Sequence, residues 1–298
     1  MLRYTIFHKC PLVLCMLTVS IVTYHTADDE LRECFASINS PLVDDIIVID
    51  NSRTPSTREI CESTPKVTYI PSDNIGYGRA HNIALRQSIA RGQRYHLVLN
   101  SDVRFDPEIL SRIASYMDAN PAIGTLQPAI FYPDGRPQFT CRLLPSPTDL
   151  LARRFLPEKW VEKINYRYLL QASDRVHTLN LPQHQGSFMF MRVDALKDVG
   201  IFDERFFLYG EDVDLTRRLH EKYLTIFWPE VSATHKHREE SYYKFRPLMS
   251  HIVNLFRYFN KWGWIFDSGR KRFNRRAVKA LEAEMSSRDS AISREQDK

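Results

Sequence analysis

The segment from Gly200 to Arg218 places five carboxylates and four large aromatic side chains close together in the sequence. Carboxylates resist burial unless they are paired or in use, whereas aromatic rings favour burial. We therefore expect acidic groups in a walled pocket, where one of them could accept a proton from an attacking hydroxyl as a general base. A second, compatible interpretation is the acidic first turn of a helix. The residues of that turn would be Glu211, Asp212 and Asp214.

Three further groups of polar residues each follow a short apolar run that is typical of a buried strand. One polar strand end is ordinary, because every strand must stop. Ligands of an open parallel sheet bind beyond the carboxyl ends of its strands, so three such ends at one edge favour a nucleotide pocket. The groups are Thr23 with Tyr24, Asp50 with Asn51, and Asn100, Ser101 and Asp102.

Apolar runs and helical patterns alternate through the first half of the chain. This alternation is typical of a parallel sheet with helices on its faces. One predicted helix carries its apolar residues on a single face, at Leu31, Cys34, Phe35 and Ile38. The predicted strands are 17–24, 45–50, 67–70, 95–99 and 123–131, and the predicted helices are 28–40, 78–91 and 107–119.

Residues 202–218 resemble the F-D-E-x-F-F-x-Y-x-E-D-x-D-L-x-x-R run of family 2 glycosyltransferases. Further motifs arrive in that family's order, so the resemblance covers roughly Leu17 to Ser241. It implies an α/β protein with the GT-A fold, which is Rossmann-like and has a mostly parallel central sheet with helices on both faces. In that family the Asp of the E-D pair is the catalytic base, here Asp212. Glu211 would tune or orient it, since adjacent carboxylates influence each other's pKa.

The resemblance also assigns nucleotide-sugar binding to the polar strand ends. Thr23 and Tyr24 would border the base. Asp50, beside Asn51, would accept a hydrogen bond from the imide N–H of the base. The segment 185–192 resembles the family's G-x-x-x-x-x-R motif, in which Gly186 and Ser187 would border the donor sugar and the acceptor. The large alternating residues of that segment predict a core strand.

Residues 73–82 resemble the family's N-x-G-x-x-x-x-N segment. Its glycines permit positive φ and close approach of the backbone, and they precede a helix N-terminus that suits anions. Gly76 would lie at the donor. Arg79 would contact the diphosphate, unless it is simply a surface arginine. Asn82 would order the loop rather than touch the donor.

Residues 97–102 resemble the family's D-x-D motif in its N-x-D form. A hard cation, Mg²⁺ or Mn²⁺, would offset charge on the leaving nucleoside diphosphate. Asn100 replaces the first Asp, which leaves Asp102 as the expected ligand; an Asx-type turn is the structural alternative. A histidine one strand beyond the E-D pair commonly completes this site, which indicates His235, with His237 as its competitor.

The chain has 298 residues, of which 43% are hydrophobic and 26% charged, so one large domain, or one domain with an appendage, is expected. The five cysteines are scattered without a C-x-x-C pair, which favours a reducing, cytoplasmic compartment and no zinc site. Residues 1–15 imitate a signal peptide but merge into the first strand, so we interpret them as an extension, with Met16 as a possible start. The glycosyltransferase domain would span 16–241, and residues 286–298 would be disordered.

Residues 242–285 form an aromatic and basic region that we expect to be helical. Aromatic rings beside lysines and arginines suit the headgroups of an anionic membrane, and peripheral attachment is one interpretation. The equal alternative is that the rings pack on the catalytic domain and the charges form a solvated helix face. The rings are Phe256, Tyr258, Phe259, Trp262, Trp264 and Phe266, and the basic cluster runs from Arg270 to Lys279.

The sequence thus predicts an inverting glycosyltransferase that uses a nucleotide-sugar and a divalent metal, and no nucleic acid. The overall pattern resembles bacterial rhamnosyltransferases of surface-polysaccharide assembly, which suggests dTDP-rhamnose as donor and a glycan or lipid-linked acceptor. Two alternatives stay open. A nucleotidyltransferase should carry a glycine-rich basic loop after its first strand, which residues 24–28 do not provide. A non-catalytic sugar- or lipid-binding module would not need Asp102, Asp212 and His235 together.

Overall fold

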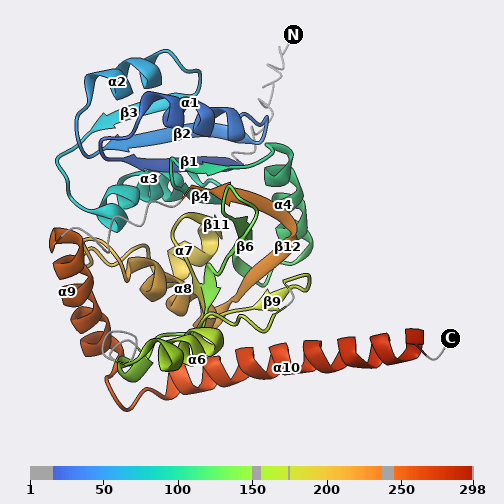
Figure 1. The fold of residues 1–298 in the computed structure, drawn as a ribbon. Coiled ribbons are helices and arrows are strands. Elements are labelled where there is room, and N and C mark those ends of the chain that lie inside the picture. The colour runs from blue at the N-terminus through green and yellow to red at the C-terminus, as the bar shows by residue number, and fades with distance from the viewer. Residues whose placement is uncertain (1–15, 150–155, 174, 237–244, 297–298) are drawn as a thin grey trace, which may run out of the picture.

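The computed structural model describes residues 16–149, 156–173, 175–236 and 245–296, which build one twisted sheet flanked by helices (Figure 1). The strand order is β3-β2-β1-β4-β11-β6-β12-β5, with β7 on β6 and β9 on β12. Residues 1–15 and His237 lie outside the described residues. The predictions about them, including the choice between Met1 and Met16 as the start, are therefore not tested by the structure. The main strands are β1 (Leu17–Thr23), β2 (Val43–Asp50), β3 (Val67–Pro71), β4 (Tyr95–Leu99), β6 (Ile123–Phe131), β11 (Phe188–Arg192) and β12 (Leu224–His235).

The sheet is mostly parallel, as the sequence predicts. β1 runs parallel to β2 and β4, and β12 runs parallel to β6. β11 lies between β4 and β6 and is antiparallel to both. The short strands are β5 (Val103–Arg104), β7 (Pro137–Gln138) and β9 (Leu179–Asn180), and β8 (Cys141–Arg142) pairs with β10 (Gln183–His184) in a separate sheet.

The two faces of the sheet carry different helices because strand side chains alternate between the faces. In β2, Ile46 and Val48 join the core beneath α1, α2 and α4, whereas Ile47 and Ile49 pack with Ala80 of α3. α7 and α8 cover the same face as α3, over Val98 and neighbouring strands. The helices are α1 (Asp28–Ser37), α2 (Pro55–Glu62), α3 (Tyr77–Arg91), α4 (Glu108–Ala119), α6 (Glu158–Tyr168), α7 (Val193–Val199), α8 (Glu211–Lys222), α9 (Phe245–Trp262) and α10 (Ser268–Gln296).

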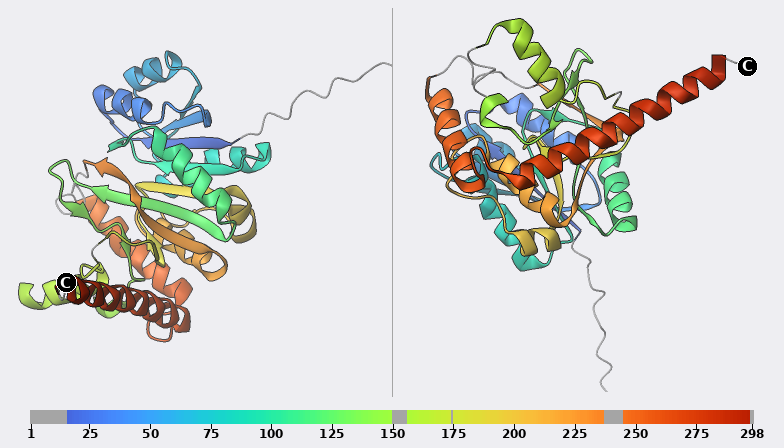
Figure 2. Two further views of the ribbon diagram at one scale, coloured as in Figure 1. Left: turned by 90° about the vertical axis from the view of Figure 1, so that its right-hand side faces the viewer. Right: turned by 90° about the horizontal axis from the view of Figure 1, so that it is seen from below.

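The C-terminal region departs from its predicted boundaries. α10 continues to Gln296, where the sequence analysis predicts disorder from residue 286. No glycine or proline follows Gly269, so nothing in the local sequence ends the helix earlier. α10 crosses the lower side of the molecule and extends past it (Figures 1 and 2). No helix in the described part of the chain is long and apolar enough to cross a membrane.

α9 and α10 pack against the sheet domain through α8. Tyr258 and Phe259 are buried with Phe206 and Phe273. These two rings therefore pack inside the protein, as the alternative to membrane contact predicts. The guanidinium of Arg217 donates to both carboxylate oxygens of Asp267, at 2.7 and 2.6 Å, and both side chains are almost fully buried. The Trp262 ring lies 4.0 Å from the same guanidinium, and its indole N–H donates to Asp214.

The buried Arg217–Asp267 pair makes a stability prediction. Asp267→Ala is expected to lower the free energy of unfolding by about 3–5 kcal/mol, because Arg217 keeps its charge in the interior without a partner. Urea unfolding followed by circular dichroism measures this loss. Asp194→Ala is the control, since it removes an exposed Asp194–Lys197 pair and should move the midpoint little. Equal losses in the two variants would show that the buried pair does not anchor the C-terminal helices.

Candidate active site

The polar strand ends meet at one edge of the sheet, as predicted, because β2, β1 and β4 are neighbours. Thr23 and Asp50 are register partners, and the Thr23 hydroxyl donates to Asp50 Oδ1 at 3.2 Å. The Asn51 N–H donates to the Thr23 carbonyl at 2.9 Å. Tyr24 follows as an exposed side chain. These contacts hold the ends of β1 and β2 together at this edge.

Asp50 is committed to the protein itself. Its carboxylate accepts from the Thr23 hydroxyl, from Ser52 N–H and hydroxyl, from Thr54 N–H and from the Tyr69 hydroxyl. Burial alone would raise the pKa of Asp50, but the hydrogen bonds outweigh it and hold the pKa below its usual value. A carboxylate offers about four lone-pair sites. The predicted hydrogen bond to the imide N–H of a base therefore finds no support in this geometry.

Gly76 was predicted to lie at the donor, but in the structure it packs against another part of the chain. Its φ is +93°, and a Cβ there would lie 2.3 Å from the Phe207 carbonyl oxygen. That carbonyl accepts from Tyr77 N–H at 2.9 Å. Glycine is needed because the aromatic loop before α8 passes directly over it.

The next turn of α3 holds the same loop. The Asn82 amide donates to the Phe202 carbonyl at 2.9 Å and accepts from Phe202 N–H at 3.1 Å, which confirms that Asn82 orders a loop. Arg79 is exposed and forms an ion pair with Glu204 at 3.5 Å. Its side chain therefore follows the surface interpretation in this structure.

Asp102 and His235 come together through the antiparallel pairing of β5 with β12. Asp102 Oδ1 lies 3.2 Å from His235 Nε2. Gln138 brackets the histidine: its Nε2 donates to the His235 carbonyl at 2.6 Å, which leaves its Oε1 2.9 Å from His235 Nδ1. An amide oxygen only accepts, so Nδ1 carries a proton. In the neutral ring, Nε2 then presents its lone pair toward Asp102.

This donor set fits a hard divalent cation. A carboxylate oxygen and an imidazole nitrogen facing each other favour a cation between them, and Gln138 is the kind of partner that fixes a ligating histidine. Two ligands at right angles around a cation about 2.1 Å away lie about 3 Å apart. Among the described residues no group of three His, Cys, Asp or Glu side chains could hold a metal ion. Donor phosphates and water would supply the other ligands.

Asp212 lies in the first turn of α8, which begins at Glu211 as the acidic pattern predicts. Its Oδ2 accepts from Gly186 N–H at 3.0 Å and its Oδ1 from Val213 N–H at 2.8 Å. Burial raises the pKa of Asp212, and the two N–H groups and the charge of Arg142 offset only part of that rise. A carboxylate that is oriented by the backbone and has a raised pKa suits a general base.

Glu211 is more deeply placed than Asp212. Burial, with Asp212 next to it, raises the pKa of Glu211 well above the usual value. Its Oε2 has no hydrogen-bond partner in the described part of the chain. Burial thus disfavours the charged form of Glu211, whereas two backbone N–H groups favour the charged form of Asp212.

Gly186 and Ser187 join the two halves of the site. The Ser187 carbonyl accepts from Asn100 N–H at 2.9 Å, and Gly186 contacts Asp212 on its other side. Ser101 is held by Glu30 of α1, to which its hydroxyl donates at 2.7 Å. The end of β4 and the start of β11 thus bring the N-x-D segment and the E-D pair to one place.

Residues 18–200 match the family described as Glycosyl transferase family 2, which covers more than half of the chain. This protein belongs to glycosyl transferase family 2.

Two curated relatives are rhamnosyltransferases by name. An N-acetylglucosaminyl-diphospho-decaprenol L-rhamnosyltransferase of Mycobacterium tuberculosis is 28% identical over 206 residues, 64% of this chain and 66% of the relative. The rhamnosyltransferase WbbL of Escherichia coli is 25% identical over 251 residues, 80% of this chain and 90% of the relative. The chain therefore spans somewhat less than two thirds of the mycobacterial protein.

Solved structures confirm the GT-A fold that the sequence predicts. GalNAc-T7 with UDP, GalNAc and Mn²⁺ superposes with a TM-score of 0.62 at 14% identity, over 88% of this chain and 50% of that one. The mannosyltransferase PcManGT from Pyrobaculum calidifontis, in complex with GDP-Man and Mn²⁺, superposes with a TM-score of 0.51 at 16% identity. The superposition covers 93% of this chain and 80% of that one. At these identities the likeness shows the fold alone.

Three residues that act on the predicted site residues were not singled out from the sequence. Tyr77 lies inside the quoted 73–82 segment, and its hydroxyl reaches Gly186 and Asn100. Gln138 orients His235, and Arg142 lowers the pKa of Asp212 against the effect of burial. Gln138 and Arg142 come from short strands that no hydrophobic pattern marks.

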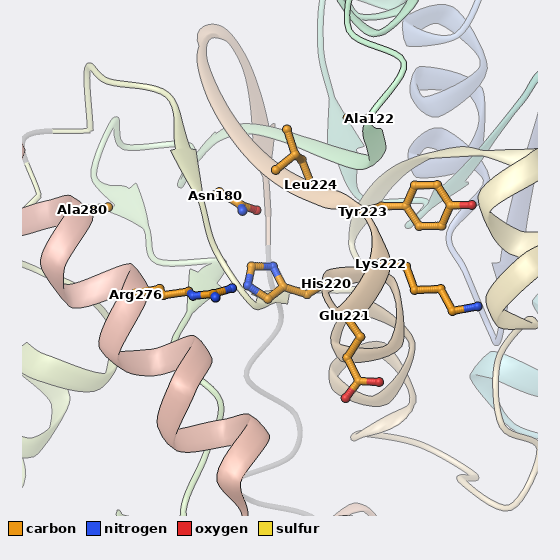
Figure 3. Close-up of a pocket in the computed structure, with 9 residues that line it drawn as sticks. All are labelled: Ala122, Asn180, His220, Glu221, Lys222, Tyr223, Leu224, Arg276 and Ala280. Atoms are coloured by element: carbon orange, nitrogen blue, oxygen red, sulfur yellow. The ribbon is translucent and has the colours of Figure 1, made fainter.

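A cavity of about 440 Å³ lies at the opposite end of α8 from the E-D pair (Figure 3). Its lining includes His220, Asn180 and Arg276, and contains none of the predicted site residues. Burial, with the charges of Arg276 and Arg272, lowers the pKa of His220 to about 4, so this ring is neutral at physiological pH. The predicted site residues lie instead at the edge of the sheet beyond the strand ends.

Proposed function

We propose that this chain transfers a sugar from a nucleotide-sugar to a hydroxyl of an acceptor, with inversion at the anomeric carbon. The observation that carries the proposal is Asp212, a partly buried carboxylate that two backbone N–H groups orient and whose pKa is raised. Family membership and the adjoining Asp102–His235 pair support it.

Each group has a role in that reaction. The nucleotide-sugar would lie across the strand ends, beside Thr23, Asn51, Asn100 and Ser101, with Tyr24 at its outer side. Asp212 takes the proton of the acceptor hydroxyl, whose oxygen attacks the anomeric carbon opposite the leaving nucleoside diphosphate. Asp102 and His235 would hold the divalent cation, which offsets charge on the diphosphate as it leaves.

The finer assignment is dTDP-rhamnose as donor and a lipid-linked glycan as acceptor, in bacterial surface-polysaccharide assembly. It is supported by the mycobacterial and E. coli relatives, both of which are rhamnosyltransferases. Acceptor sites are built from loops that differ between enzymes on one fold, so the substrate needs a direct measurement.

A panel of dTDP-rhamnose, UDP-galactose, UDP-glucose and GDP-mannose, read by nucleoside diphosphate release, tests this function. Release with one donor and acceptor-dependent product would support transfer. A non-catalytic binding module would give no release with any donor in the presence of Mn²⁺. A nucleotidyltransferase would instead form a nucleotide-sugar from a sugar phosphate and a nucleoside triphosphate.

Asp212→Asn is expected to reduce kcat by roughly 10²–10⁴-fold, because the variant lacks the proton acceptor. Donor affinity should stay nearly unchanged. In the native enzyme, kcat should fall as pH drops through the raised pKa of Asp212, since only the ionised carboxylate accepts a proton. Glu221→Gln, at the exposed end of the same helix, is the control. If Asp212→Asn keeps most of the native turnover, Asp212 is not the base.

Activity is expected to disappear with excess chelator and to return with Mn²⁺ or Mg²⁺. Asp102→Ala should weaken the affinity for metal and for donor together, because both meet at this carboxylate. Titration calorimetry with nucleoside diphosphate and Mn²⁺ measures both. Full turnover in chelator would show a metal-independent enzyme and would remove the roles of Asp102 and His235 as ligands.

We further propose peripheral attachment at the cytoplasmic face of an anionic membrane. α9 exposes a second apolar stripe at i, i+3, i+4 and i+7 spacing, opposite its buried face, and the loop between α9 and α10 continues it with Ile265 and Phe266, the latter 90% exposed. The exposed basic residues of α10 lie directly after this loop and would attract anionic headgroups. The stripe consists of Met249, Ile252, Val253 and Phe256, and the basic residues are Lys271, Arg272, Arg275, Arg276 and Lys279.

Liposome flotation tests the attachment. The protein should float with anionic vesicles and not with neutral ones, and added salt should weaken the binding. Replacing Ile265 and Phe266 together by Ser should abolish flotation, whereas Tyr166→Ser, an exposed aromatic on α6, should not. Absence of binding to anionic vesicles at low salt would contradict membrane attachment.

A further inference from the structure

The hydroxyl of Tyr77 lies between two oxygen atoms of the site. It is 2.8 Å from the Gly186 carbonyl oxygen and 2.9 Å from the side-chain oxygen of Asn100. Both oxygens are acceptors, while a phenol has a single proton to donate. Burial and nearby carboxylates, Glu211 first among them, raise the pKa of Tyr77 well above the usual value, so the hydroxyl keeps that proton. One of the two contacts would therefore bring two acceptors face to face.

Only one of these partners can be reversed. The Gly186 carbonyl oxygen can only accept, and the backbone on both sides of it is held, by Gly186 N–H on Asp212 Oδ2 at 3.0 Å and by the Ser187 carbonyl on Asn100 N–H at 2.9 Å. The two ends of an asparagine amide have nearly the same shape, and their orientation follows from hydrogen bonding. If Asn100 is turned by half a rotation, its Nδ2 donates to the Tyr77 oxygen, and the Tyr77 proton goes to Gly186. All three groups are then satisfied.

We propose that Tyr77 is a positioning residue that orients the Asn100 amide, with Nδ2 toward Tyr77 and the oxygen toward the bound nucleotide-sugar. The inference rests on the proposed function, because it needs a donor beside Asn100. It also gives a reason for the N-x-D form of the motif. A carboxylate at this position presents an oxygen whichever way it turns, whereas an amide needs a partner that distinguishes its two ends.

The backbone around Asn100 leaves this side chain as the part that can vary. Asn100 N–H is held by the Ser187 carbonyl, and the Tyr77 ring is fixed edge-on against His81, with centroids 4.4 Å apart. Removing only the Tyr77 oxygen should therefore release the amide without moving the ring or the strand end.

A double-mutant cycle tests the proposal with dTDP-rhamnose, or with whichever donor of the panel the native enzyme uses. Tyr77→Phe should raise the KM for the donor about fivefold, the effect of one hydrogen bond. Its kcat should change less than about twofold, because the N–H donors to Asp212 do not include Tyr77. In an Asn100→Asp background, Tyr77→Phe should change the KM by less than about twofold, since a carboxylate needs no orientation.

Tyr95→Phe is the matched control. Tyr95 is buried at the first residue of β4, the strand that Asn100 follows, and its hydroxyl donates to Asp118. It should leave the donor KM unchanged. An equal rise in KM for Tyr77→Phe in both backgrounds, or no rise in either, overturns the proposal while the proposed function stands. A native enzyme that releases nucleoside diphosphate from no donor overturns both. Melting temperatures of all variants establish that the comparison is between folded proteins.

Discussion

The hydrogen bond from the Gly186 peptide N–H to Asp212 connects the parts of this site. It exists because β11 enters the sheet antiparallel to β4, so the residues just before β11 lie beside those just after β4. A side chain at residue 186 would crowd Tyr77 and Asp212, with its Cβ 3.3 Å from the Tyr77 ring. The absence of a side chain lets the backbone itself orient the carboxylate. Strand order and one glycine thus place the acidic pair against the nucleotide edge.

The start of α8 is fixed from the other side by α3. Gly76 admits the Phe207 carbonyl, and Asn82 holds the Phe202 peptide through both ends of its amide. The aromatic loop before α8 therefore packs on α3, and the acidic residues emerge at its end. The glycine-rich segment resembles a ligand-binding loop in the sequence. In the structure its glycine instead allows this close approach of two backbones.

The C-terminal helices extend the same helix system rather than forming a separate module. Arg217 leaves α8 to meet Asp267, and Lys261 reaches Asp203 and Asp214. Two of the acidic residues in the 200–218 segment are thereby neutralised from α9, and Asp212 is left for other chemistry. The aromatic residues of this region divide between two environments, since Tyr258 and Phe259 are buried while Phe256 and Phe266 face outward.

The sequence by itself determined the main strand and helix segments, because hydrophobic periodicity is a local property. The convergence of Thr23, Asp50 and Asn100 was predicted from the rule that ligands of an open parallel sheet lie beyond the carboxyl ends of its strands. The boundaries of β4 and β6 agree with the predicted runs. Tertiary structure decided which polar groups are still available. Asp50 accepts from the turn that follows it and from Thr23 and Tyr69 of the neighbouring strands, Gly76 is covered by Phe207, and Arg79 pairs with Glu204. Tertiary structure also brings Tyr77 to Asn100, 23 residues away in the sequence, and Gln138 to His235, 97 residues away. Such contacts depend on the packing of distant segments, and no spacing in the chain encodes them.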